Sequence, residues 1–228
     1  MARPKKTGVS KIAAEAKKEA LVPMPEITPL DYERISNETE GWLSPAEGDL
    51  LWLTAEQHWH KDAQWVEDGS YKGKSTVLLG GVLALHQGGW LQAVDPHSGD
   101  LSYPSQVKDG LMDGEPRNEG SSLEGFQQTI QRAHLESYVS LVQRRFTDHV
   151  PPSPVDLVFL DGLHDFASVY ADYKHIRQFL TPDATVIFHD VGAWTGPTQV
   201  VNVAVAMGEL QIIEQADSMC VCKFLGAK

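Results

Sequence analysis

Polar residues close two predicted strands in the second half of the chain. Asp161 and His164 follow the apolar stretch 155–160, and His189 and Asp190 end the stretch 184–190. If both stretches are parallel strands of one sheet, their carboxyl ends meet at the edge where ligands bind. Carboxylates and imidazoles gathered there can hold a divalent cation, and a histidine titrates in the range that suits proton transfer. The sequence therefore predicts a reaction site at this edge.

A glycine turn lies upstream, at residues 66–76, with the sequence Val-Glu-Asp-Gly-Ser-Tyr-Lys-Gly-Lys-Ser-Thr. Gly69 and Gly73 bracket the turn, and glycines permit positive φ and close approach of backbone to a ligand. The helix that follows presents unpaired N–H groups at its start, which suits a nucleotide-like cofactor. Glu67, two residues before the first glycine, would repel phosphate and favours a positively charged cofactor such as S-adenosylmethionine.

A second acid supports this interpretation. Asp95 ends the predicted strand 89–95, at the position where a carboxylate would hold a ribose diol. A P-loop is excluded because Asp68, not glycine, stands five residues before Gly73. NAD is a weaker candidate because the three-glycine spacing is missing, and a plain strand–turn–helix remains the structural alternative. We expect six side chains to converge on one crevice: Glu67, Asp95, Asp161, His164, His189 and Asp190.

The elements that must position these residues alternate along the chain. Apolar patterns predict strands beginning near residue 64 and over 89–95, 138–142, 155–161, 184–190, 210–214 and 219–224, and helices over 45–54, 75–85, 122–133, 166–180 and 196–207. Such alternation predicts a doubly wound α/β sheet. The long polar segment 96–120, which contains His97, is expected to be functional or mobile and to close over a substrate.

Composition sets broad limits. The chain has 228 residues and a net charge of −12, which disfavours nucleic acid as a partner. No stretch approaches the roughly 20 apolar residues of a membrane span.

Residues 1–29 hold the main basic block and are expected to form a flexible tail, with docking to an acidic partner or a membrane as the alternative. Residues 30–228 are expected to form one domain that begins with a helical cover.

Cysteine usage bears on the compartment. Cys220 and Cys222 are two residues apart in a predicted strand. We expect them to point to opposite faces and therefore to form no disulfide with each other. Unpaired thiols favour a reducing, cytoplasmic location.

The chain resembles a class I S-adenosylmethionine-dependent methyltransferase of the bacterial small-molecule O-methyltransferase type, methyltransferase family 24. The likeness runs from about Trp42 to Phe224. It rests on Glu-Gly-Trp-Leu-Ser at 40–44, Gly-Ser-Tyr-Lys-Gly-Lys-Ser-Thr at 69–76, Val-Asp-Pro-His at 94–97, Leu-Glu-Gly-Phe at 123–126, Phe-Leu-Asp-Gly-Leu-His at 159–164 and Phe-His-Asp-Val at 188–191. The resemblance implies a Rossmann-like, doubly wound seven-stranded sheet with order 3-2-1-4-5-7-6, the last strand antiparallel, and helices on both faces.

The resemblance also implies roles for residues. S-adenosylmethionine would contact Glu67, Gly69, Ser70, Tyr71, Gly73, Ser75, Asp95, Pro96, His97, Gln143, Asp161, Gly162 and Leu163. Mg²⁺ or another divalent cation would be held by Asp161, His189 and Asp190. His164 would take the proton of the acceptor, with Asp161 as the second catalytic residue. The implied partner is a small molecule with a hydroxyl group, without nucleic acid or membrane, and a homodimer is a candidate assembly.

Some positions depart from the family pattern. Asp68 stands where the family usually has an apolar residue, Leu163 replaces a common acid, and His189 replaces an acid that many metal-dependent relatives use. The usual glycine pair before the strand at 184 is also missing. Two other readings therefore stay open: a metal-dependent hydroxylase-like enzyme on the same fold, and a catalytically inactive cofactor-binding or scaffold homologue.

Overall fold

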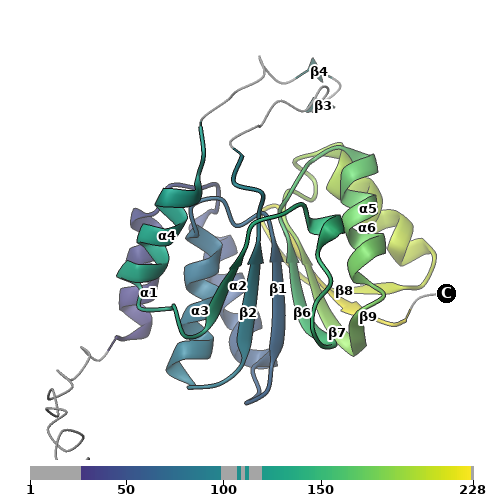
Figure 1. Ribbon diagram of the computed structural model, residues 1–228. Helices are drawn as coiled ribbons and strands as arrows, with labels where there is room; N and C mark the ends of the chain where they lie inside the picture. Colours follow the sequence, from purple (N-terminus) through teal and green to yellow (C-terminus); the bar gives the residue numbers. More distant parts are fainter. Residues whose placement is uncertain (1–26, 99–106, 109–110, 113–119, 227–228) are drawn as a thin grey trace, which may run out of the picture.

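The computed structural model describes residues 27–98, 107–108, 111–112 and 120–226. A seven-stranded sheet forms its centre, in the order β5-β2-β1-β6-β7-β9-β8 (Figure 1). Its strands are β1 (Gln64–Asp68), β2 (Trp90–Val94), β5 (Val139–Val142), β6 (Val155–Leu160), β7 (Leu180–Phe188), β8 (Leu210–Ala216) and β9 (Met219–Phe224). Numbered within this sheet, the order is 3-2-1-4-5-7-6, and β9 runs antiparallel to β7 and β8. The predicted Rossmann-like topology is confirmed.

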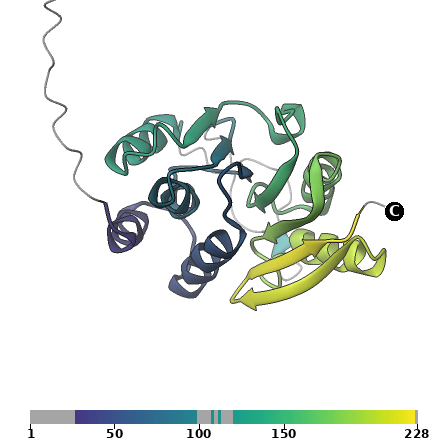
Figure 2. The same ribbon diagram turned by 90° about the horizontal axis from the view of Figure 1, so that it is seen from below.

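Helices cover both faces of the sheet, as Figure 2 shows in a view along the strands. They are α1 (Pro29–Glu38), α2 (Pro45–His58), α3 (Lys74–Leu85), α4 (Leu123–Arg132), α5 (Phe166–Ile176) and α6 (Thr195–Ala206), with a short 3₁₀ turn at Phe146–Asp148. Side chains of α1 to α4 form one apolar core with the sheet, and those of α5 and α6 form the other. Neighbouring strands in a strand–helix–strand unit point the same way, so their carboxyl ends share one edge.

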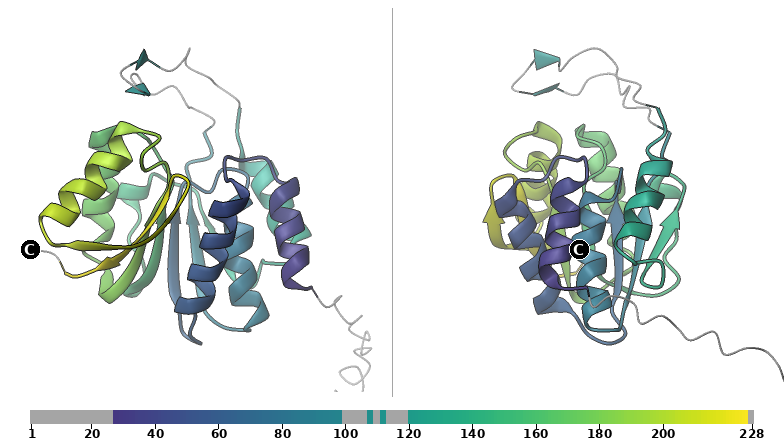
Figure 3. Two further views of the ribbon diagram at one scale, coloured as in Figure 1. Left: turned by 180° about the vertical axis from the view of Figure 1, so that it is seen from behind. Right: turned by 90° about the vertical axis from the view of Figure 1, so that its left-hand side faces the viewer.

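The first two helices form the N-terminal cover, seen beside α3 in Figure 3. Each begins with a capping box and a proline in the first turn: Thr28 with Asp31 in α1, and Ser44 with Glu47 in α2. Helix α1 packs closely on α3 because Gly81 has no side chain; a Cβ there would lie 2.7 Å from a ring carbon of Tyr32.

The boundaries of α5 and β7 differ from the prediction. Helix α5 ends at Ile176 rather than near residue 180, and β7 begins at Leu180 rather than at Ala184. Pro182 therefore lies inside a strand, where it cannot donate to the ladder. The ladder between β6 and β7 is irregular at this point, with a register shift after Val155, and this irregularity accommodates the proline.

The expectation that the two cysteines point to opposite faces of the strand was wrong. Residues i and i+2 of a strand share a face, and Cys220 and Cys222 are both buried with their sulfur atoms 3.7 Å apart. Both thiols are free.

Parts of the sequence predictions lie outside the described residues. Residues 1–26 of the expected tail are outside the described residues, and the predicted boundary at 29 falls at the start of α1. Most of the expected loop at 96–120 is also outside the described residues. The described parts are its two ends and two short strands, β3 (Val107–Lys108) and β4 (Leu111–Met112), which pair with each other. Among the described helices, none has the length and apolar character that a bilayer crossing requires.

A buried ion pair ties helix α5 to the connection between α6 and β8. Arg177 Nη1 lies 2.5 and 2.7 Å from the two carboxylate oxygens of Glu209. Tyr173 donates its hydroxyl to the same carboxylate, at 3.0 Å. Glu209 is fully buried, so removing it leaves a largely buried guanidinium without its partner.

We expect Glu209→Ala to lower the free energy of unfolding by about 3 kcal/mol, because breaking a buried ion pair strands the remaining charge. Tyr173→Phe, which removes one hydrogen bond to the same acid, should cost about 1 kcal/mol. Urea denaturation of the two variants measures the difference. Equal costs would show that the ion pair adds nothing to the hydrogen bond.

Candidate active site

The glycine turn after β1 lies directly against the end of β6. Gly69 has φ +84°, and a Cβ at this position would lie 2.3 Å from the carbonyl oxygen of Asp161. The Gly69 amide donates to Val94 O at 2.9 Å, and the Asp161 amide donates to Asp68 O at 2.9 Å. The turn therefore joins the tips of β1, β2 and β6, and a side chain at position 69 would separate them.

Asp95, at the tip of β2, holds two backbone segments in place. One carboxylate oxygen accepts from the Tyr71 amide at 2.8 Å, and the other accepts from the His97 amide at 2.6 Å. Tyr71 and His97 both have positive φ, 43° and 50°, a costly conformation for residues other than glycine. Each carboxylate oxygen keeps a further lone pair for a ligand.

Glu67 lies behind the turn. Its side chain is fully buried, and its two oxygens accept from Ser75 Oγ and Thr76 Oγ1 at the start of α3, each at 2.5 Å. Burial raises the pKa of Glu67 to about 7, although both hydroxyl groups act to lower it. The hydrogen bond between Glu67 and Ser75 therefore ties the end of β1 to the start of α3. The Gly73 amide closes the turn by donating to Ser70 O at 2.7 Å.

Two buried polar atoms near the turn and Asp95 have no hydrogen-bond partner among the described residues: Ser70 Oγ and His97 Nε2. The other ring nitrogen of His97 lies 2.8 Å from Ser122 Oγ. Burial lowers the pKa of His97, so its imidazole is neutral at neutral pH. Gln143 donates to Pro96 O, one residue before His97, at 3.5 Å. Unsatisfied buried polar groups are rare in native proteins, and these two are suited to a bound ligand.

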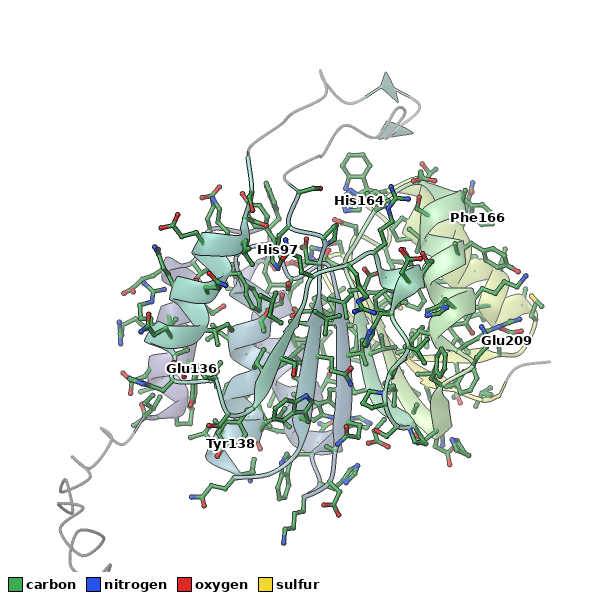
Figure 4. The ribbon with its side chains drawn as sticks, viewed as in Figure 1. His97, Glu136, Tyr138, His164, Phe166 and Glu209 are labelled. Atoms are coloured by element: carbon green, nitrogen blue, oxygen red, sulfur yellow. The ribbon has the colours of Figure 1, made fainter. Side chains whose placement is uncertain are left out.

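A second cluster stands at the tips of β6 and β7. His164 Nε2 lies 2.8 Å from Asp190 Oδ2, and the other ring nitrogen of His164 is buried without a partner among the described residues. Asp190 has φ +62°. Burial alone would raise its pKa, but His164 and His189 hold it well below its usual range. Figure 4 shows His164 and His97 at the same end of the sheet.

His189 is the buried cation of this cluster. Its Nδ1 lies 3.0 Å from Asp161 Oδ1 and 3.5 Å from Asp190 Oδ2, and its Nε2 lies 3.2 Å from Glu47 Oε2. The last contact is an ion pair without aligned hydrogen-bond geometry. Burial acts to lower the pKa of His189, but the three carboxylates raise it to about 12. The imidazole is therefore charged.

This placement changes the set that could hold a metal. The sequence predicts Asp161, His189 and Asp190, but both ring nitrogens of His189 face carboxylates. The structure instead brings ligand atoms of Asp161, His164 and Asp190 within 4.8 Å of one another. No local sequence pattern indicates the contact of Glu47 with a histidine 142 positions later in the chain.

Asp68 turns to the opposite face of the sheet from Glu67. Its carboxyl group is a close neighbour of that of Asp172 on α5, and two buried carboxyls so close together avoid like-charge repulsion by sharing a proton. Burial raises the pKa of both groups, that of Asp172 to about 7. The two acids line a cleft shared with Asp161, Leu163 and His164, and the cleft has room for about one water molecule. Gly162, at the cleft, lies close to Asp68: a Cβ there would be 3.0 Å from its carboxylate oxygens.

Comparison with known proteins identifies the chain's relatives. The family model described as "Methyltransferase domain" matches residues 66–191, which is more than half of the chain. The match begins in β1, ends just after β7, and so includes every strand tip of both clusters.

Solved structures with the same fold include several O-methyltransferases. One, from Bacillus cereus in complex with S-adenosylhomocysteine, has a TM-score of 0.57 and 16% identity, and the match covers 90% of this chain and 93% of that chain. TomG from Streptomyces achromogenes, in complex with S-adenosylmethionine, has a TM-score of 0.58, 14% identity, and coverage of 90% and 93%. NovP has a TM-score of 0.64, 17% identity, and coverage of 78% and 79%. At these identities the likeness shows the shared fold.

The shared proton between Asp68 and Asp172 predicts a pH dependence. A carboxyl whose folded pKa is raised is protonated in the folded state but ionised in the unfolded state, so its contribution to stability falls as pH rises from about 4 to 7. We expect Asp172→Asn to remove this loss and to be more stable than the wild type by roughly 1–3 kcal/mol at pH 8, with a smaller difference at pH 5.

Urea denaturation of both proteins across this range measures the difference. Asp148→Asn, at an exposed acid, is the matched control and should show a difference that does not change with pH. If the stability difference between Asp172→Asn and the wild type also did not change with pH, this result would argue against a shared proton.

Proposed function

The chain belongs to the methyltransferase-domain family and is an S-adenosylmethionine-dependent methyltransferase, and from this premise we propose that it methylates a hydroxyl group of a small molecule. The observation that carries this proposal is the His164–Asp190 pair at the carboxyl edge of the sheet, 2.8 Å apart. An imidazole oriented by a carboxylate is a general base. The likeness in fold to O-methyltransferases agrees with an oxygen acceptor.

The residues around the glycine turn fit the proposed cofactor. Asp95 has lone pairs left for a ribose diol, and the unpartnered Ser70 Oγ and His97 Nε2 are polar atoms that a bound nucleoside can satisfy. We keep the predicted cofactor set, with one change of role: Glu67 would act from behind the turn, through Ser75 and Thr76, rather than by contact.

S-adenosylmethionine supplies an electrophilic methyl group on a positively charged sulfur. In our proposal the protein aligns the acceptor oxygen, excludes water and removes the hydroxyl proton. His164 would accept that proton at Nδ1, because Nε2 faces Asp190. Asp190 would stabilise the resulting imidazolium. The carboxylates of Glu47, Asp161 and Asp190 outnumber the one imidazolium of His189, so the cluster is negative. A negative cluster favours a positively charged methyl donor nearby.

A divalent cation is a second element of the proposal. Asp161, His164 and Asp190 would hold it, and when bound it would lower the pKa of the acceptor hydroxyl. A donor set with an imidazole suits Mn²⁺ or Zn²⁺ better than Mg²⁺. His164 could not then also serve as the base. The non-heme iron set of hydroxylases has two histidines and one carboxylate. The set Asp161, His164 and Asp190 has one histidine and two carboxylates.

We expect Asp95→Ala to weaken S-adenosylhomocysteine binding about 100-fold, because the variant loses the ribose acceptor and releases the Tyr71 and His97 amides. Isothermal titration calorimetry measures the affinity. Asp62→Ala, at an exposed acid near the start of β1, should bind as the wild type does. Unchanged affinity in Asp95→Ala would refute the ribose role.

We expect His164→Ala to reduce turnover about 10²- to 10⁴-fold, the usual contribution of a general base, with cofactor affinity unchanged. The acceptor assay incubates the enzyme and S-adenosylmethionine with phenols, sugars and polyketides and detects a gain of one methyl group by mass spectrometry. Chelator treatment separates the two schemes: full activity without metal supports His164 as base, and loss restored by Mn²⁺ supports the cation. No methylated product from any hydroxyl compound would count against the acceptor class.

A further inference from the structure

We propose that Glu47, on helix α2 of the N-terminal cover, is a positioning residue for the reaction. It holds the ring of His189 against Asp161 and thereby fixes the Asp161 carboxylate beside the base. A role in the reaction rests on the proposed function, whereas the contacts of Glu47 with His189 and Ser218 do not depend on it. Helix α2 lies outside the matched family segment, 66–191.

Glu47 joins three distant parts of the chain. Oε2 accepts from the Ser44 amide at 2.8 Å and lies 3.2 Å from His189 Nε2. Oε1 accepts from the amide and the hydroxyl of Ser218, in the turn between β8 and β9, at 3.0 and 2.6 Å. Glu47 is only 4% exposed. Burial acts to raise its pKa, but His189, Ser218 and Ser44 lower it to about 2, so it is ionised.

The His189 ring is held at both ends. Nε2 lies 3.2 Å from Glu47 Oε2 and Nδ1 lies 3.0 Å from Asp161 Oδ1, so the imidazole cannot rotate without losing one of these contacts. Asp161 Oδ1 is engaged by that ring, which leaves Oδ2 as the oxygen available to the reaction. Without Glu47, the Nε2 end of the ring is released, and His189 is held only through the contacts of Nδ1 with Asp161 and Asp190.

A second contact ties the cover to the cofactor turn. The Tyr71 hydroxyl donates to Glu40 Oε1 at 3.1 Å, and Lys74 Nζ donates to the carbonyl oxygens of Ser36 and Thr39 at 3.0 and 3.2 Å. The cover thus contacts the cofactor turn through residues 36–40 and the proton-transfer cluster through Glu47. Both contacts are made at the functional edge of the sheet.

A capping role alone does not account for Glu47. A capping box works equally with glutamate or glutamine, and the contact with His189 lies outside it. Asp31 gives an internal comparison, because it caps α1 in the same way at an exposed position and has Thr28 and Arg34 as its partners. Glu47→Gln keeps the cap when its amide oxygen faces Ser44, and it then removes the charge together with the acceptor that faces the Ser218 amide. Asp31→Asn is the matched control.

The experiment compares the wild type, Glu47→Gln and Asp31→Asn, each saturated with S-adenosylhomocysteine. NMR measures exchange of the ring N–H protons of His189 with water, and crystal structures locate the Asp161 carboxylate. We expect exchange at Nε2 to rise about tenfold or more in Glu47→Gln, because local opening becomes easier, and the Asp161 carboxylate to shift. Asp31→Asn should match the wild type in both.

Kinetics give a third readout. In Glu47→Gln, turnover should fall about tenfold while the affinity for S-adenosylhomocysteine changes less than about threefold, because the residue acts on Asp161 and not on the cofactor turn. In a His189→Gln background, adding Glu47→Gln should have no further effect, since the two act as a unit. If Glu47→Gln does not fold, Ser218→Ala loosens Glu47 by one hydrogen bond and should act in the same direction.

The proposal is overturned if His189 exchange and the Asp161 position in Glu47→Gln, or in Ser218→Ala, equal those of the wild type. Failure of the proposed function looks different: the wild type would not bind S-adenosylhomocysteine or would not methylate hydroxyl compounds. In that case the NMR and crystallographic comparison, carried out without ligand, still decides whether Glu47 positions His189 and Asp161.

Discussion

A buried positive charge organises the functional edge of this protein. The imidazolium of His189 is stable only because carboxylates from β6, β7 and helix α2 surround it within 3.5 Å. Burying an unpaired charge costs far more than a typical interaction contributes. The cluster therefore forms only when the two strand tips and the cover are all in place, and it joins the N-terminal cover to the candidate site.

The parallel sheet supplies the rest of the arrangement. Its strand tips carry acids: two at β1, Glu67 and Asp68, and one each at β2, β6 and β7, namely Asp95, Asp161 and Asp190. These acids are not equivalent. Glu67 and Asp68 turn to opposite faces and bond to helices, Asp95 organises backbone amides, and Asp161 and Asp190 pair with histidines. Neighbouring carboxyls thus differ in charge and task because their partners differ.

Much of this was predictable from local sequence patterns. Alternating apolar runs and the family motifs predicted the sheet order, and the acids at strand tips predicted that these side chains gather at one edge of the sheet. What local patterns could not predict was the direction of side chains whose partners are distant in sequence. His189 turns toward Glu47 instead of offering a ligand atom, and Asp172 shares a proton with Asp68. The strand start at Leu180 was missed because Pro182 usually excludes a strand, and the ladder irregularity that admits it has no sequence signal.

The contact between Glu47 and His189 also constrains how related chains can diverge. Many metal-dependent relatives carry an acid in place of His189, as the resemblance implies. With Glu47 retained, such an acid would bury a second negative charge near that of Glu47, an arrangement that two carboxylates avoid by sharing a proton. The two positions are therefore expected to covary across the family, with a glutamate at 47 accompanying a histidine at 189.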